Sequence, residues 1–399
     1  MSNARPLSSL TLSELRQRTS EKWRHYPSDV VPLWVAEMDV PLAEPIQRAL
    51  HDAIAIGDLG YPMDDAYLVA FAAFAARRWN WDGIDSAHSI PVANVMTGVA
   101  AAIAVLTDPG DTVVVNCPVY PPFYSYSERS GRVVSEAPLG ADGRLDFEEL
   151  EAAFERARAK SVRPAYLLCN PHNPTGTLHR TDELTRVLEL ADRYGLRVIS
   201  DEIHAPLVLR GDFTPLLRLA GAERAVAVLS ASKAFNLAGA PAAVLVAGRN
   251  GADVIQALGQ RVVPGPSQLG VIAQSAALTD GDDWLDILLE DLCARQELLI
   301  HLLAEQLPDA RYLPGDATYL AWLDLRSLNL ESPVDSPRGD MAGESGPAAY
   351  FLEHARVALS GGAAFGSGGV GHARLNFATT ESILRGALEQ MGRAVGNRH

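Results

Sequence analysis

The sequence is short of lysine. Only three of its 34 Lys and Arg residues are lysines, at positions 22, 160 and 233, so arginine serves as the general surface cation. Lys22 and Lys160 lie in polar, helix-like sequence, whereas Lys233 lies in the uncharged run AVAVLSASKAFNLAGAPAAVLVAG. An amine in such apolar surroundings either reaches water from a strand end or is chemically engaged, which arginine cannot imitate because it keeps its proton. Lys233 is therefore the first candidate for a reactive group.

Cysteine is also scarce: the chain has Cys117, Cys169 and Cys293, without a CxxC pair. Such an odd, sparse set excludes a disulfide scaffold and is typical of a reducing compartment, so we expect a cytoplasmic protein. No uninterrupted apolar run approaches the roughly 20 residues of a membrane-spanning helix. The first residues also lack the apolar core of a signal peptide. We therefore expect no membrane partner.

Positive charge is in deficit. The 399 residues include 34 Lys and Arg against 49 Asp and Glu, which gives a formal net charge of −15, and no basic patch offsets it. Such a chain would repel nucleic acid, so we expect no nucleic-acid partner. Hydrophobic residues make up 48% and charged residues 21%, a composition that excludes disorder and predicts a globular protein with a large core.

Strand-like and helix-like segments alternate along the chain. Short apolar runs of buried-strand length lie at 112–115, 165–169, 196–200, 225–229 and 242–247. Helical patterns lie at 10–23, 44–56, 64–79, 98–106, 146–160 and 181–194, and an extended stretch lies at 30–40. This alternation predicts an α/β fold in which a mostly parallel sheet is covered by helices on both faces.

The pattern changes after about residue 283. A long helix at 283–306 is followed by a strand at 318–325, a helix at 348–359 and a strand at 373–378. We expect a large domain over 51–282, a smaller α+β domain over 283–399, and an N-terminal arm, 1–50, that joins the small domain. The segment 327–346 is rich in Ser, Pro, Gly, Asp and Glu, which predicts a solvent loop.

Polar side chains follow three of the predicted strands. Asn173 lies in NPHNPTG, Asp201 begins DEIH, and Lys233 ends SASK. Because ligands collect at the carboxyl ends of parallel strands, we expect these side chains to converge. The lysine and the carboxylate could form a structural ion pair. The same set supplies what pyridoxal 5′-phosphate (PLP) requires: an amine, an acid for the ring nitrogen, a donor to the phenolic oxygen, and hydroxyls and amides for the phosphate.

Other catalytic motifs are missing from the sequence. The chain has no HExxH spacing and no cysteine cluster, so we expect no metal. It has no GxSxG elbow either, which argues against a serine hydrolase.

The motifs SxSKxFNxAG, NPxNPTG and DEIH, in this order and spacing, resemble the class I/II aminotransferase family of fold-type I PLP enzymes. WVAEMD at 34–39, NPHNPTG, DEIH and SKAFNLAG are most similar to the MalY/PatB-type C–S lyases, also described as cystathionine β-lyase-like. The resemblance spans nearly the whole chain. It implies a large PLP-binding domain, a smaller α+β domain, and a homodimer with active sites at the interface.

The resemblance also implies roles for residues around the ring of PLP. Lys233 would form the Schiff base and then move the Cα proton, and Asp201 would pair with the pyridinium nitrogen. Asn173 would donate to the phenolic oxygen, with His204 doing similar work nearby. Tyr120 would stack on the ring and assist protonation of the leaving group. The residues themselves leave open that His204 and Tyr120 are packing side chains.

Further roles concern the phosphate and the substrate. Gly98, Val99 and Ala100 in MTGVAAAI are expected to open a helix whose amides bind the phosphate, and Ser230 and Ser232 would add hydroxyls. Tyr61 resembles the tyrosine that reaches the phosphate from a partner subunit, although it could equally be a packing aromatic. Arg374 matches the arginine that holds the substrate α-carboxylate, a bidentate task suited to guanidinium.

The predicted activity is PLP-dependent β-elimination from cystathionine or a related cysteine S-conjugate, which yields a thiol, pyruvate and ammonia. Many aminotransferases carry an arginine eight residues after the lysine, where this chain has Pro241, and the MalY/PatB-type enzymes also lack it. One alternative is an aminotransferase that acts on an amino acid and a 2-keto acid. A second is a PLP-binding regulator that acts through protein contacts.

Overall fold

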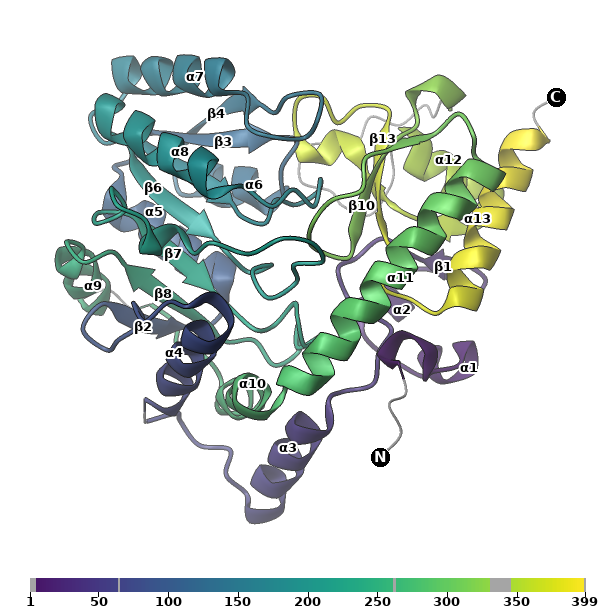
Figure 1. Ribbon diagram of the computed structural model, residues 1–399, viewed down its shortest axis with the longest axis horizontal. Helices are drawn as coiled ribbons and strands as arrows, with labels where there is room; N and C mark the ends of the chain where they lie inside the picture. The colour runs from purple at the N-terminus through teal and green to yellow at the C-terminus, as the bar shows by residue number, and fades with distance from the viewer. Residues whose placement is uncertain (1–4, 64, 261–262, 331–345, 398–399) are drawn as a thin grey trace.

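The computed structural model describes residues 5–63, 65–260, 263–330 and 346–397. Two β-sheets organise the chain: a seven-stranded sheet on the left of Figure 1 and a four-stranded sheet on the right. A long helix, α11 (Asp282–Gln306), connects the two regions. Across the residues that the structure describes, no helix combines the length and apolar character needed to cross a membrane.

The large sheet has the strand order β2-β8-β7-β6-β5-β3-β4. Its strands are β2 (Ser89–Val92), β3 (Thr112–Cys117), β4 (Val133–Pro138), β5 (Ala165–Cys169), β6 (Arg197–Asp201), β7 (Val226–Leu229) and β8 (Ala243–Ala247). The pairs from β4 through β3, β5 and β6 to β7 are parallel, and β8 runs antiparallel to both β7 and β2. The predicted α/β fold with a mostly parallel sheet is confirmed.

Helices cover both faces of this sheet because successive strand residues point to opposite sides. Val113 and Val115 of β3 belong to a core with helices α5 and α9, whereas Val114 between them packs in a separate core with α7 and α8. The helices of the large-sheet region are α3 (Glu44–Ile56), α4 (Ala66–Trp79), α5 (Val95–Leu106), α6 (Pro122–Arg129), α7 (Phe147–Lys160), α8 (Thr181–Tyr194), α9 (Ala252–Gly259) and α10 (Gln268–Asp280).

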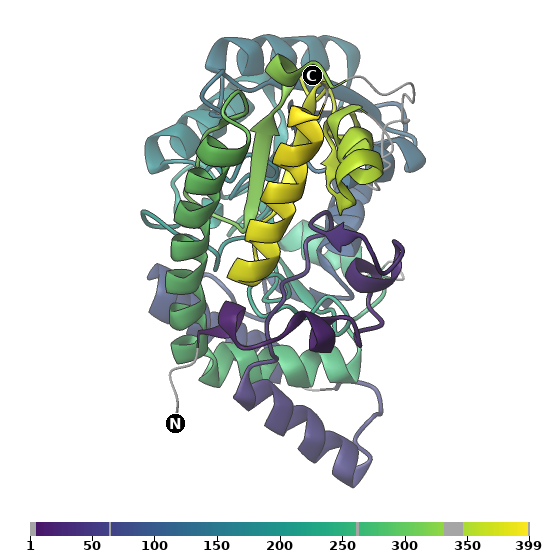
Figure 2. The same ribbon diagram turned by 90° about the vertical axis from the view of Figure 1, so that its right-hand side faces the viewer.

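The second sheet is antiparallel, with the order β12-β13-β10-β9. Its strands are β9 (Arg311–Tyr312), β10 (Leu320–Asp324), β12 (Ser360–Gly361) and β13 (His372–Asn376). Helices α12 (Gly346–Ala355) and α13 (Glu381–Gly396) complete this region, and α13 lies beside α11 (Figure 2). The N-terminal segment joins it through β1 (Val31–Pro32), which pairs in parallel with β11 (Val357–Ala358). Short 3₁₀ helices lie at Pro6–Ser8, Leu216–Arg218, Arg326–Leu328 and Gly362–Phe365.

Several sequence predictions need correction. The helix expected at 10–23 is two short helices, α1 (Leu12–Leu15) and α2 (Glu21–Arg24), because the chain turns between them and buries Lys22 and Trp23. The extended stretch at 30–40 contains strand only at β1, since the backbone beyond it bonds to side chains and to single backbone groups such as the Ala378 carbonyl, without forming a ladder with a second strand. Of the loop expected at 327–346, residues 331–345 lie outside the described residues.

Candidate active site

A cavity of about 290 Å³ lies beside the carboxyl ends of β5 and β6. It brings together side chains that the sequence placed in one site, from both sheets and their loops. Seven of the predicted residues line it: Tyr120, Asn173, Asp201, His204, Ser232, Lys233 and Arg374.

Lys233 presents its amine inside this cavity. Its Nζ donates a hydrogen bond to the backbone carbonyl of Ala36, at 3.0 Å. Burial, reinforced by the charge of Arg374, lowers the pKa of Lys233 to about 8. At pH 7 an amine with this pKa is uncharged in about a tenth of the molecules, and this uncharged form can act as a nucleophile or a base.

Asp201 ends β6 and is also buried. Its Oδ1 accepts a hydrogen bond from the backbone N–H of Ile203, at 3.0 Å. Burial raises the pKa of Asp201 to about 7, against the smaller lowering effects of that hydrogen bond and of Lys233. A cationic ligand atom at this carboxylate would keep it ionised.

Arg374 lies on β13 and is only 1% exposed. Its Nη1 donates to Asn173 Oδ1 at 3.1 Å, and its Nη2 donates to the Trp34 carbonyl at 3.0 Å and to Ser360 Oγ at 3.2 Å. Nε has no hydrogen-bond partner within the described ranges, and burial lowers the pKa of Arg374 to about 10. Among the described residues no carboxylate forms an ion pair with it, so a buried guanidinium is available for an anionic ligand.

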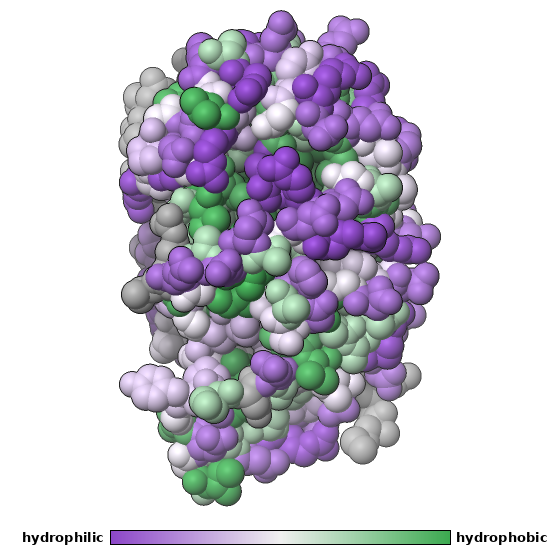
Figure 3. Space-filling view, turned by 90° about the vertical axis from the view of Figure 1, so that its left-hand side faces the viewer, coloured by the Kyte–Doolittle hydropathy of each residue, from purple (hydrophilic) through white to green (hydrophobic). Residues whose placement is uncertain are grey.

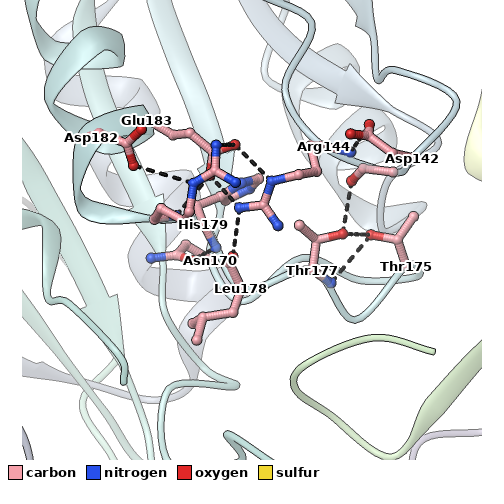
Figure 4. Close-up of polar contacts among 11 residues, drawn as sticks. Asp142, Arg144, Asn170, Thr175, Thr177, Leu178, His179, Asp182 and Glu183 are labelled. Atoms are coloured by element: carbon pink, nitrogen blue, oxygen red, sulfur yellow. Dashed lines mark hydrogen bonds and ion pairs between the residues drawn. The ribbon is translucent and has the colours of Figure 1, made fainter. Parts of the chain in front are cut away.

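The loop that carries Asn173 is anchored by a polar network, drawn in Figure 4. Arg144 donates from Nε to Glu183 Oε1 at 2.8 Å, and from Nη2 both to Glu183 Oε2 and to the Leu178 carbonyl. Thr177 Oγ1 donates to the Gly143 carbonyl at 2.7 Å. These bonds fasten the loop after β5 to the turn that precedes α7, which fixes the position from which Asn173 reaches the cavity.

Two glycines allow this loop to approach the second sheet. Gly176 has φ 71°, and its carbonyl accepts the backbone N–H of Ala317 at 2.9 Å. A Cβ on Gly176 would lie 2.7 Å from the Ala317 carbonyl oxygen, and a Cβ on Gly315 would lie 2.6 Å from the Cα of Gly176. Only glycine therefore fits at both positions.

The helix expected to bind the phosphate begins earlier in the chain than the sequence predicts. Helix α5 begins at Val95, because Asn94 caps it by accepting the N–H of Thr97 at 2.9 Å. The amide of Gly98 is already bonded to the Asn94 carbonyl. The prediction that Gly98, Val99 and Ala100 open this helix is wrong; they lie within it. Residues at the true helix start line the cavity instead: Asn94, Val95 and Met96.

Two serines lie at the same end. Ser230 and Ser232 have their Oγ atoms 2.6 Å apart, and Gln274 Nε2 donates to Ser232 Oγ at 2.9 Å. Ser232 lines the cavity, whereas Ser230 donates to the Ala242 carbonyl and supports it from behind.

The remaining predicted residues differ in placement. His204 is buried in the cavity wall, and its Nδ1 has no partner in the part of the chain that the structure describes. Desolvation lowers the pKa of His204 to about 3, which keeps the ring neutral. Burial raises the pKa of Tyr120 to about 12, so its hydroxyl is protonated. Tyr61 is 98% exposed and is absent from the cavity of its own chain.

Sequence reasoning missed the contribution of backbone carbonyls. Trp34 and Ala36 supply acceptors for Arg374 and Lys233, and Tyr319 Oη also donates to the Ala36 carbonyl at 3.0 Å. The motif WVAEMD marked this segment, but residue types do not reveal which carbonyls turn toward a site.

Residues 89–391 match the family model described as "Aminotransferase class I and II". The chain belongs to the class I and II aminotransferase family. Within this family it is 51% identical over 396 residues to a Mycobacterium leprae protein named "Putative cystathionine beta-lyase", with 98% of each chain covered. It is 33% identical to the cystathionine beta-lyase of Corynebacterium glutamicum, covering 95% of this chain and 98% of the relative.

A solved structure agrees with this fold. The chain superposes on a Corynebacterium diphtheriae protein described as a "putative plp-dependent beta-cystathionase" with a TM-score of 0.88. The two are 32% identical, and the match covers 98% of this chain and 99% of the other.

Proposed function

We propose that this protein is a PLP-dependent carbon–sulfur β-lyase that cleaves cystathionine or a related cysteine S-conjugate to a thiol, pyruvate and ammonia. The observation that carries the proposal is the joint presence in one cavity of a desolvated lysine, a carboxylate and an arginine without a carboxylate partner among the described residues. The similarity to named cystathionine beta-lyases over nearly the whole chain supports the same activity.

The residues of the cavity fit PLP. Lys233 supplies the amine that bonds the cofactor, Asp201 the carboxylate for its ring nitrogen, and Asn173 an amide for its phenolic oxygen. The unpartnered Nδ1 of His204 is a buried polar atom that a ligand in the cavity could satisfy. Ser232 and the start of α5 offer a hydroxyl and helix N-terminal amides to a phosphate.

When bound, PLP supplies an electron sink for the electron pair that remains after the Cα proton is removed. Arg374 binds and orients the substrate α-carboxylate, which places Cα near the Lys233 amine. Once the amine of the substrate has taken its place on the cofactor, the freed Lys233 amine would take the proton from Cα as a general base. Tyr120, which stays protonated because of its raised pKa, donates a proton to the departing sulfur.

The direct test is release of pyruvate and free thiol from L-cystathionine by the PLP-loaded protein, with no keto acid added. We expect release that disappears in Lys233→Ala and persists in Lys160→Ala, whose lysine lies at the exposed end of α7. Release that is unaffected by Lys233→Ala would overturn the assignment.

Aminotransferase activity is the rival reaction, because it begins with the same proton removal. Pro241, which lines the cavity, favours the lyase because many aminotransferases have an arginine at this position after the lysine. Product formation that requires an added keto acid would support the rival.

We also propose that two copies assemble, so that Tyr61 of one reaches the phosphate end of the other. Supporting this, apolar or aromatic side chains are exposed around the end of α3 and the following loop, where Figure 3 shows apolar atoms at the lower tip of the molecule. The most exposed of these are Ile54, Ile56, Leu59, Tyr61 and Met63. Such a patch is typical of an interface.

Mixed subunits test this arrangement. Tyr61→Phe and Lys233→Ala subunits, each impaired alone, should regain partial activity when combined, since one mixed site then has both native residues. Failure to regain activity in a confirmed mixed dimer would count against a shared site. We also propose a cytoplasmic location, because the sequence has only three cysteines and no CxxC pair.

A further inference from the structure

Two backbone carbonyls near the N-terminus hold the two cations of the active site. The Trp34 carbonyl accepts Arg374 Nη2, and the Ala36 carbonyl accepts Lys233 Nζ, each at 3.0 Å. They lie on the segment 34–39, which follows β1 and is neither helix nor strand. Backbone hydrogen bonds hold only part of it, from the Glu37 N–H to the Val35 carbonyl and from the Asp39 N–H to the Ala378 carbonyl, each at 2.9 Å. Side chains must therefore complete its positioning.

Side chains from other parts of the chain bind the neighbouring carbonyls, those of Val35 and Glu37. Asn376 Nδ2 donates to the Val35 carbonyl at 2.8 Å and to the Glu37 carbonyl at 2.6 Å. The Glu37 carbonyl also accepts Lys22 Nζ at 3.0 Å. Lys22 thus binds the carbonyl of Glu37, the residue next to Ala36, whose carbonyl holds Lys233.

Lys22 forms a buried ion pair with Asp39 at the end of the same segment. Its Nζ lies 2.8 Å from Asp39 Oδ2, and the two side chains are 0% and 1% exposed. Trp23 Nε1 donates to Asp39 Oδ1 at 2.9 Å. A buried pair of this kind contributes little net stability compared with an apolar pair of similar volume, but it defines geometry because each group must keep its partners.

We propose that Lys22 and Asp39 are positioning residues that hold the segment 34–39 so that its carbonyls orient Lys233 and Arg374. The inference rests on the proposed function, in which these two cations bond the cofactor and bind the substrate carboxylate. The charged groups that face Lys233 are Arg374, Glu37 and Asp201. The Ala36 carbonyl adds the negative end of a dipole, which favours the protonated form of the lysine nitrogen.

The test is the double variant Lys22→Met/Asp39→Asn, which removes both charges and the bond to the Glu37 carbonyl while keeping an acceptor for Trp23. The matched control is Arg295→Met/Asp291→Asn, which neutralises a second buried pair, on α11 and away from the cavity. Both proteins are loaded with PLP. The measurements are the pH midpoint of the cofactor absorbance, kcat and KM for L-cystathionine, and the melting temperature.

We expect the double variant to bind PLP with its absorbance midpoint lowered by about 0.5 pH unit or more, because the lysine nitrogen loses a well-aimed dipole. We expect kcat/KM to fall by about tenfold or more. A misplaced Lys233 should lower kcat, and a misplaced Arg374 should raise KM. The control should change neither quantity, whatever its melting temperature.

A folded double variant with the midpoint, kcat and KM of the native protein would overturn the inference. Should it not fold, Asp39→Asn alone breaks the ion pair while keeping an acceptor for Trp23, and native values in that variant would overturn the inference equally. If the native protein shows no cofactor absorbance at all, the proposed function fails, and the inference fails with it. If the native protein is active but the double variant has the same midpoint, kcat and KM, the inference fails while the proposed function stands.

Discussion

Nη1 of Arg374 lies 3.1 Å from Oδ1 of Asn173. Arg374 is on β13 of the small antiparallel sheet, and Asn173 is in the loop after β5 of the large one. The side chain that we propose to bind the substrate carboxylate and the one that we propose for the cofactor's phenolic oxygen therefore touch each other across the two sheets. We therefore expect a substitution at this contact to weaken substrate binding more than it lowers the stability of the fold.

Replacing Arg374 by lysine should weaken substrate binding. Lysine retains the positive charge but loses the bidentate geometry and the fixed bonds to Trp34 and Asn173. We expect KM for L-cystathionine to rise about tenfold or more, with a smaller effect on kcat. Steady-state kinetics measure this, and Arg385→Lys, on the exposed side of α13, is the control. An unchanged KM would contradict the role of Arg374.

Asp201→Asn should stabilise the cofactor-free protein while it removes activity. The folded-state pKa of Asp201, about 7, exceeds its ordinary value of 3.8, so the folded protein retains a proton that the unfolded chain has lost. Stability should therefore fall as pH rises between these values, by about 4 kcal/mol in total. Urea unfolding of the two apoproteins should show a gap that widens from about pH 4 to about pH 7 and then levels off. A gap independent of pH would show that burial does not raise this pKa.

Arg144→Met should loosen the loop that carries Asn173. The substitution leaves the Glu183 carboxylate, whose side chain is 5% exposed, without its main cationic partner. We expect the free energy of unfolding to fall by about 2 kcal/mol. Arg193→Met, which breaks the exposed pair with Glu151, should cost less than about 0.5 kcal/mol. Equal losses in the two variants would mean that burial of the Arg144 pair is unimportant.

Gly315→Ala should force apart the loops that join the two sheets, because its Cβ would meet the backbone of Gly176 at 2.6 Å. We expect a loss of stability of about 1–3 kcal/mol, together with a higher KM as Arg374 and Asn173 separate. Gly386→Ala, in α13, meets no atom within 4 Å and should stabilise the protein by about 0.5–1 kcal/mol. Thermal unfolding distinguishes the two, and a neutral Gly315→Ala would contradict the close contact.

The sequence predicted the buried elements well, because apolar runs and helix caps are local signals. The predicted helices at 44–56 and 181–194 match α3 and α8 at both ends. Each helix stops at a glycine with positive φ, Gly57 or Gly195, which is a local signal. Strand β4 was missed because it lies at the sheet edge, where half-exposed residues such as Ser135 and Glu136 break the apolar run. Helix α10 was missed because its apolar and polar residues are spread around the helix and do not gather on one face, so the helical period is not visible in the sequence.

For the candidate site, the sequence supplied the side chains but not their backbone partners. Lys233, Asp201 and Asn173 were predictable because each follows a strand of the same sheet. The start of α5 was misplaced because the capping role of Asn94 depends on the backbone conformation of that residue, which composition does not reveal. The burial of Lys22 was unforeseen because its partner, Asp39, lies 17 residues away.

The bond between the Arg374 guanidinium and the Trp34 carbonyl joins positions 340 residues apart in the chain. During synthesis, residue 34 therefore leaves the ribosome long before its partner exists. The large sheet, whose strands end at residue 247, can form while the substrate-binding end is still incomplete. Proteolysis that removes residue 34 or residue 374 would consequently damage the same pocket, and this end of the pocket can be completed only after β13 has been made.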